Sequence, residues 1–96
     1  MTEAQLLAFL SADEAVQGQL LQLLVLGARL HLDGPSEEIV MTGPRIGRGE
    51  GEMARVPYRP DSGLAERRFA ARLLLINANR VFMGRLPVSC VTPTEG

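Results

Sequence analysis

A helix that is apolar around most of its circumference is expected between Ala12 and Ala28. Leucine and valine recur there at spacings of three and four residues, which gives a wide apolar surface rather than a narrow stripe. A short chain has little material to cover such a helix, so either a sheet of the same chain or a second copy of the helix must do so. We therefore expect a homodimer interface on this segment, formed by Leu20, Leu21, Leu24 and Val25.

A second, shorter helix is expected just before it, over about residues 3–10. Thr2 followed by Gln5, and Ser11 followed by Glu14, both have the capping-box form. In a capping box, a hydroxyl and a side chain three residues later satisfy the free amides at a helix start. The N-terminal end of the chain is therefore predicted to form two helices.

The middle of the chain divides into a hairpin and a loop. Over residues 29–42, Leu30 and Leu32 alternate with polar residues, a turn-forming segment follows, and Ile39 begins a second apolar stretch, which together predict a β-hairpin. Residues 43–63 hold five glycines and three prolines without apolar periodicity. We predict a long, mobile loop there, with room for one short strand at about residues 54–58, because unstructured segments of this length are usually functional or disordered.

The last third of the chain admits two interpretations. Residues 65–72 have high helix propensity, and two apolar runs on either side of Asn77 and Asn79 have the pattern of a hairpin. The favoured prediction is a short helix followed by a hairpin within residues 64–91, with Cys90 on its last strand. The alternative is a single helix over residues 63–83.

These elements predict one α+β domain over residues 1–96, since a chain of 96 residues is one domain at most. Two helices within residues 1–28 pack on a small antiparallel sheet, or partly open β-barrel, made from residues 29–42 and 73–91. An all-α bundle is the alternative if residues 63–83 form one helix.

The composition removes several kinds of enzyme chemistry. The chain has no lysine, which removes Schiff-base catalysis and the lysine of a P-loop. Cys90 and His31 are the single cysteine and the single histidine, so neither an intrachain disulfide nor a Cys/His zinc site is expected. We expect no catalytic residues, no metal, no cofactor and no membrane anchor, and a cytoplasmic location.

Charge is distributed unevenly along the chain. Residues 1–42 hold six acidic residues and one arginine, whereas residues 43–96 hold nine arginines and five acidic residues. Arg68 and Arg72 stand four positions apart on a predicted helix, where like charges repel unless something anionic faces them. The sequence therefore predicts ligand or partner contacts at Arg45, Arg48, Arg68 and Arg72, unless the acidic half of the chain neutralises them.

The segment from Glu66 to Arg72 resembles the E-R-R-x-x-x-R opening of PilZ domains. The resemblance implies that Arg68 and Arg72 grip cyclic di-GMP. The second PilZ motif is not met, and the residues after Arg72 are too few for a complete PilZ barrel. The order of elements is also similar to the N-terminal module of flagellar-brake proteins.

A competing resemblance links the chain to forkhead-associated domains. Ile46-Gly47-Arg48, followed by Glu66 to Ala70, is similar to the G-R and S-R-x-H-A blocks of that family. Glu66 and Phe69 replace the serine and histidine of the second block. This resemblance implies a phosphopeptide-binding fold that lacks its phosphothreonine-binding serine.

The function expected from the sequence is a non-enzymatic regulatory or assembly module that works by protein contact, as a homodimer or with a protein partner. The alternative is a small-ligand binder, for a cyclic dinucleotide, or a nucleic-acid binder that uses the arginine-rich half. Nucleic acid is the less favoured ligand, because Tyr58 is the one aromatic residue near the arginines that could stack on bases.

Overall fold

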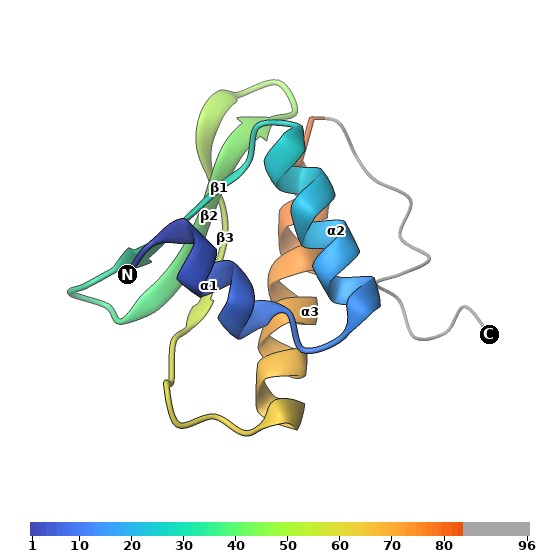
Figure 1. Ribbon diagram of the computed structural model, residues 1–96. Coiled ribbons are helices and arrows are strands. Elements are labelled where there is room, and N and C mark those ends of the chain that lie inside the picture. The colour runs from blue at the N-terminus through green and yellow to red at the C-terminus, as the bar shows by residue number, and fades with distance from the viewer. Residues whose placement is uncertain (84–96) are drawn as a thin grey trace.

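The computed structural model describes residues 1–83, and it is an α+β fold with three helices and three strands (Figure 1). The elements follow in the order α1 (Glu3–Leu10), α2 (Glu14–Val25), β1 (Arg29–Asp33), β2 (Glu38–Arg45), β3 (Gly49–Pro57) and α3 (Leu64–Val81).

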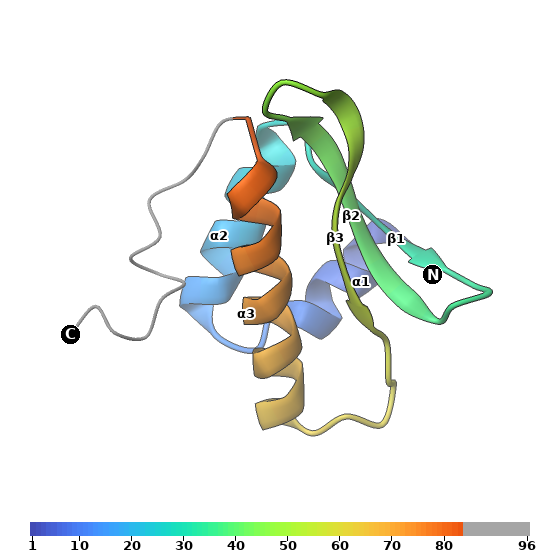
Figure 2. The ribbon, with the colours of Figure 1, turned by 180° about the vertical axis from the view of Figure 1, so that it is seen from behind.

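The strands form an open antiparallel sheet in the order β1-β2-β3. The helices lie on one side of it, as the view from behind shows (Figure 2). α1 contacts β1, α3 contacts β3 and β2, and α2 packs against α1 and α3. The core lies between these layers, because the strand residues that join the core cluster alternate with residues on the open face. The core strand residues include Leu30, Ile39, Met41, Ala54 and Val56.

The two N-terminal helices begin at different kinds of cap. At α1, Thr2 and Gln5 form the predicted capping box, with backbone-to-side-chain bonds of 3.1 and 2.8 Å. The box predicted at Ser11 is wrong, because α2 is capped by Asp13, whose Oδ1 accepts from the Val16 amide at 2.9 Å. The Ser11 hydroxyl instead donates to the Leu7 carbonyl at the end of α1. Asp13 therefore fixes where α2 starts.

The long loop predicted over residues 43–63 is wrong for most of its length. β2 continues to Arg45, and β3 pairs with it from Gly49 to Pro57. The glycines that suggested a loop lie at the tip of this hairpin, where Gly47 and Gly49 have positive φ angles of 68° and 72°. The register shifts between Met41 and Thr42, which interrupts the alternation along β3 and removes the usual sequence signal of a strand.

The short helix and hairpin predicted for residues 64–91 are wrong over the described part. α3 is one helix from Leu64 to Val81, and residues 84–91, with Cys90, lie outside the described residues. The apolar run at residues 73–76 divides between two sides of this helix, since Leu74 and Leu75 are buried while Leu73 is exposed. The all-α alternative is also wrong, because this single helix packs on a sheet.

The tip of the β2–β3 hairpin is attached to the end of α3. The Ile46 amide donates to the Val81 carbonyl at 2.8 Å, and the Met83 amide donates to the Pro44 carbonyl at 2.9 Å. Phe82 is buried beside this junction and forms a bridge with Arg45. Side chains at the hairpin tip are therefore held against the C-terminal end of α3.

Within residues 1–83, none of the helices combines the length and apolar character that crossing a membrane requires.

Candidate functional site

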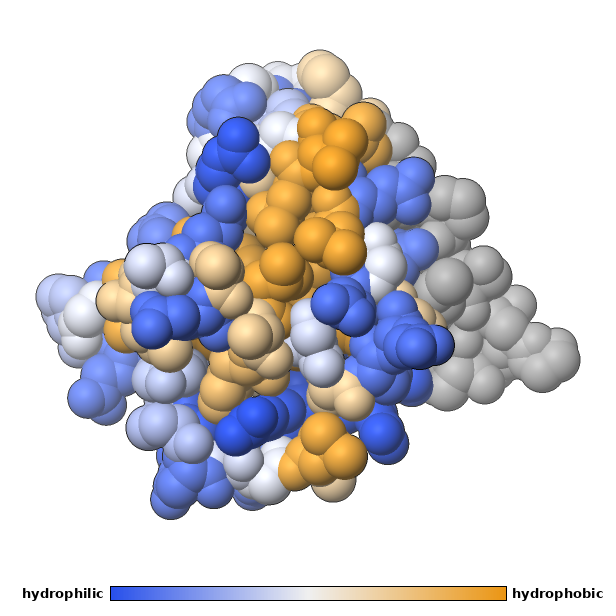
Figure 3. Space-filling model, viewed as in Figure 1, coloured by the Kyte–Doolittle hydropathy of each residue, from blue (hydrophilic) through white to orange (hydrophobic). Residues whose placement is uncertain are grey.

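The outward side of α2 carries an apolar surface, which appears as an orange band over this helix (Figure 3). Val25 is 83% exposed, Leu26 47% and Leu21 43%, and we call these three residues the α2 ridge. Of the predicted interface residues, Leu21 and Val25 lie on this ridge. Leu20 is fully buried in the core, and Leu24 is half-buried against it.

The helix that carries the α2 ridge is uncharged between its two ends. No charged residue occurs between Glu14 at the start of the helix and Arg29 just beyond its end. Gly18 shares the ridge side and is exposed, and a Cβ added there would meet nothing within 4 Å. The Arg29 guanidinium lies at the C-terminal end of α2, where it donates to the Leu24 and Ala28 carbonyls. The apolar ridge thus has an acidic residue at one end and a basic residue at the other.

Arg68 and Arg72 face the acidic N-terminal half of the chain. Arg72 Nη2 lies 3.4 Å from Asp13 Oδ2, and Arg68 Nε lies 3.2 Å from the same oxygen. The Arg68 contact is an ion pair without hydrogen-bond geometry, because Arg68 Nε has no hydrogen-bond partner among the described residues. Two guanidinium groups therefore share one carboxylate, and the repulsion expected between them is offset from inside the fold.

Asp13 is held in its ionised form by these neighbours. The hydrogen bond from the Val16 amide lowers the pKa of the Asp13 carboxyl most, and the Arg72 and Arg68 guanidinium groups lower it further. The same side chain thus caps α2 and pairs α2 with α3.

Arg45 and Arg48 lie apart from Arg68 and Arg72. They stand at the hairpin tip beside Val81. Arg72 lies earlier on α3, and its position is separated from that of Val81 by ~14 Å along the helix axis, at a rise of ~1.5 Å per residue. The four predicted contact residues therefore form two separate groups. Arg45 and Arg48 instead line a hollow of about 400 Å³ together with Arg80, Ile46, Glu52 and Val81, which we call the arginine hollow.

An apolar groove of about 410 Å³ lies between the start of α3 and the end of β3. We call it the α3–β3 groove; its apolar lining includes Phe9, Val56, Pro57, Phe69, Ala70 and Leu73. Phe69 stands 71% exposed at this groove. Phe9 itself is held from two sides, by an edge-on contact with Tyr58 at 4.9 Å and by the Arg67 guanidinium 4.8 Å from its ring centre. The groove therefore has a fixed floor and one exposed aromatic side chain.

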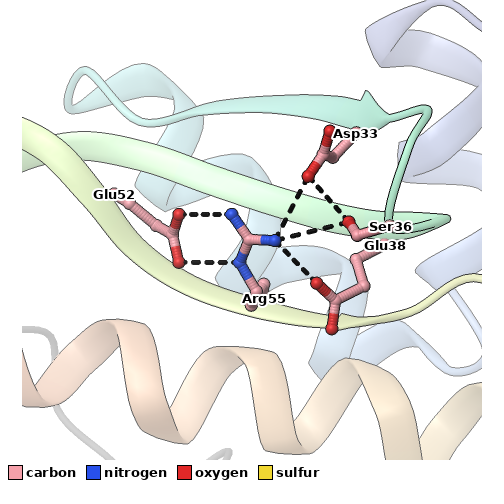
Figure 4. A network of polar contacts seen from close by, with 5 residues as sticks. All are labelled: Asp33, Ser36, Glu38, Glu52 and Arg55. Atoms are coloured by element: carbon pink, nitrogen blue, oxygen red, sulfur yellow. Dashed lines mark hydrogen bonds and ion pairs between the residues drawn. The ribbon is translucent and has the colours of Figure 1, made fainter.

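A polar cluster occupies the open face of the sheet (Figure 4). Arg55 on β3 holds both carboxylate oxygens of Glu52, at 2.6 and 2.8 Å, and one oxygen of Glu38 at 2.6 Å. Its Nη1 also reaches Asp33 at 3.3 Å and Ser36 at 3.4 Å. We call these five residues the Arg55 cluster, which joins all three strands and the turn between β1 and β2.

The Arg55 cluster favours the ionised forms of Asp33 and Glu52. The Ser36 hydroxyl, followed by Arg55, holds the pKa of Asp33 below its ordinary value, and Arg55 does the same for Glu52. The carboxylates in turn raise the pKa of Arg55. No group of three or more His, Cys, Asp or Glu residues within residues 1–83 is arranged as a metal site.

His31 lies on β1 and is exposed, with Asp33 two residues further along the strand. The Asp33 carboxylate is already engaged by Ser36 and Arg55, so it is not available to orient the histidine as in a catalytic triad.

Three of these features were missed by sequence reasoning. Arg55 was expected in a loop or in a short strand within it, with no cluster around it, and Leu26 was left out of the α2 interface. Phe69 was read as a replaced motif residue rather than as an exposed aromatic at a groove. Treating residues 64–81 as one helix would have identified Phe69, since it lies two positions before the buried Ala71 and outside the series formed by Ala71, Leu74, Leu75 and Ala78.

Comparison of the chain with protein-family models, curated proteins and solved structures gave no match.

Proposed function

We propose that this chain is a non-enzymatic regulatory or assembly module of the cytoplasm that works by protein contact, and that its first partner is a second copy of itself. The observation that carries the proposal is the α2 ridge, which exposes Val25, Leu26 and Leu21 on one helix. Because the ridge contains no charged side chain, a dimer would bury these residues without removing a charge from water.

An antiparallel pairing of two α2 helices fits the positions of the residues on this side. If the two-fold axis passes between residues 21 and 22, Gly18 of one copy lies opposite Val25 of the other. Glu14 of one copy then lies opposite Arg29 of the other. Such an arrangement is self-complementary, as a two-fold interface must be, and it brings unlike charges together at both ends.

Gly18 supports the same arrangement. Glycine within a helix costs about 1 kcal/mol relative to alanine, and no neighbour in the described chain would obstruct a Cβ there. Contact with a partner supplies a reason for the glycine, because the missing side chain leaves a space that Val25 of a second copy would fill.

The test is the molar mass measured by light scattering after size-exclusion chromatography, over a range of protein concentrations. The wild type is expected to be a dimer at micromolar concentration, and Val25→Glu a folded monomer, because Val25 is too exposed to matter for the core. Leu64→Glu is the matched control, since Leu64 is 59% exposed on another helix. It should leave the dimer intact.

Charge exchange tests the orientation. Glu14→Arg alone and Arg29→Glu alone should each weaken the dimer, and the double exchange should restore it. A wild type that stays monomeric at high micromolar concentration contradicts the proposal. A dimer that Val25→Glu leaves intact would place the interface elsewhere.

A further inference from the structure

The arginine hollow at the end of the β2–β3 hairpin is built from residues that neither the α2 ridge nor the core requires. Arg45, Arg48 and Arg80 are among its lining residues, together with the apolar residues Ile46 and Val81. Its volume of about 400 Å³ lies in the range of small-molecule sites. The hydrogen bonds from Ile46 to Val81 and from Met83 to Pro44 hold the hairpin and α3 together around it.

Arg45 is held in place by backbone groups rather than by an acid. Its Nε donates to the Gly49 carbonyl at 3.2 Å, and its Nη2 donates to the Glu50 carbonyl at 3.4 Å. The guanidinium lies directly over Gly51, where an added Cβ would come within 2.5 Å of Arg45 Cζ. The glycine therefore leaves the space in which this side chain lies, and carbonyl bonds orient it without neutralising its charge.

The acidic residue in the lining does not neutralise the hollow. Glu52 has both carboxylate oxygens bound by Arg55, which lies outside the hollow. Among the described residues, neither Arg45 nor Arg48 forms an ion pair with a carboxylate. The Arg45 and Arg48 side chains, which line an open space without such an ion pair, are suited to bidentate binding of phosphate oxygens.

We propose that the arginine hollow binds a small organic phosphate of nucleotide size. Arg45 and Arg48 bind its phosphate oxygens, and Ile46 and Val81 contact its apolar or aromatic part. This site is distinct from the Arg68 and Arg72 pair, whose charge is directed at Asp13.

The experiment is calorimetric titration of the full chain with ADP and with inorganic pyrophosphate, without magnesium, at two salt concentrations. ADP is expected to bind several-fold more tightly than pyrophosphate, and both to weaken as salt rises. Arg48→Gln should weaken ADP binding about tenfold, as expected for loss of a charged hydrogen-bonding partner. Gly51→Ala should also weaken it, because the new methyl displaces the Arg45 guanidinium at little cost to the fold.

Arg59→Gln is the matched control, because it removes the same charge from an exposed arginine that lines the α3–β3 groove instead. It should leave ADP affinity unchanged. An absence of heat with both ligands would overturn the proposal, and so would equal weakening by Arg59→Gln and Arg48→Gln, which indicates unspecific attraction. Equal affinities for ADP and pyrophosphate would contradict the proposed contacts of Ile46 and Val81 with the organic part of the ligand. Circular dichroism of each variant separates lost binding from lost folding.

Discussion

The Asp13 carboxylate and the Arg72 guanidinium stand 59 positions apart in the chain and meet at 3.4 Å, between Oδ2 and Nη2. Asp13 is also the N-cap of α2, through its other oxygen, and Arg68 approaches the same Oδ2 as Arg72 does. One carboxylate therefore combines a local task, starting a helix, with a tertiary one, joining α2 to α3.

Substitutions of Asp13 separate these two tasks. Asp13→Ala removes both the cap and the ion pairs, and it should lower the free energy of unfolding by about 1–2 kcal/mol. Asp13→Asn keeps an oxygen for the Val16 amide and should cost clearly less. Urea unfolding of the three proteins measures the difference. Equal losses for alanine and asparagine would mean that the cap contributes nothing.

The two arginines should behave as alternatives for one partner. Arg68→Gln or Arg72→Gln alone is expected to cost under about 0.5 kcal/mol, because the remaining guanidinium keeps Asp13 paired. The double variant should cost up to about 1 kcal/mol, more than the sum of the single changes. A double-mutant cycle in thermal or urea unfolding measures this coupling.

The same double variant tests the resemblance to PilZ domains. We expect the double variant to respond to cyclic di-GMP as the wild type does, since Asp13 already faces both arginines. Heat that appears with the wild type and disappears with the variant would instead favour the dinucleotide as ligand.

Acid should weaken the Arg55 cluster. The folded-state pKa values of Asp33 and Glu52 lie below their ordinary values of 3.8 and 4.5. Their contribution to stability is therefore complete above about pH 5, and it is lost as the pH falls through the lowered values. Arg55→Gln should lower the melting temperature at pH 6 and much less at pH 3, whereas Arg59→Gln should show little pH dependence. A constant effect of Arg55→Gln at both pH values would count against the ion pairs.

The first cleavage in limited proteolysis should fall in the turn of the β2–β3 hairpin, and not at any arginine of the glycine-rich segment alike. Among the bonds of residues 43–63, trypsin is expected to cut first after Arg48, which lies in the turn between β2 and β3. Arg45 and Arg55 lie in paired strands, and Arg59 precedes Pro60, a bond that trypsin cleaves poorly. Mass spectrometry of the earliest fragments measures the order. Cleavage after Arg55 as early as after Arg48 would show that β3 opens readily.

Substitution by alanine should change the free energy of unfolding in opposite directions at two glycines. In the monomeric Val25→Glu background, Gly18→Ala is expected to raise the free energy of unfolding by about 0.5–1 kcal/mol, because the helix gains propensity at no steric cost. Gly43→Ala should lower it by about 1–3 kcal/mol, since a Cβ there meets Met53 Cε at 3.0 Å and Ala28 Cα at 3.1 Å. Chemical denaturation measures both. A destabilising Gly18→Ala would contradict the open position of that residue.

Much of the fold is encoded over short stretches of the chain. The capping box of Thr2 and Gln5 starts α1, the leucine spacing of α2 gives a helix, and the alternation around Leu30 with the following turn gives β1 and β2. These patterns involve residues within a few positions of each other, so a reading of the sequence is enough to find them.

The candidate sites were only partly predictable for the opposite reason. The apolar character of α2 indicated a surface near Leu21 and Val25, but which leucines point inward depends on where α1 and α3 pack. The sequence identified four arginines that were expected to contact an anionic ligand or partner: Arg45, Arg48, Arg68 and Arg72. Their separation into two groups follows from the attachment of the hairpin to Val81, which no local pattern contains.

The sequence by itself determined a small α+β chain with two N-terminal helices, a β1–β2 hairpin and an arginine-rich second half, because helix caps, periodicity and composition are local properties. Tertiary structure decided that a strand extends over residues 49–57, well beyond the short strand allowed at about residues 54–58, and that residues 64–81 form one helix rather than a helix and a hairpin. β3 has weak alternation and is held by its pairing with β2, and α3 buries Ala71, Leu74 and Leu75 in the core shared with the sheet. Burial and hydrogen bonds supplied by distant residues outweigh the weak local preferences of both segments.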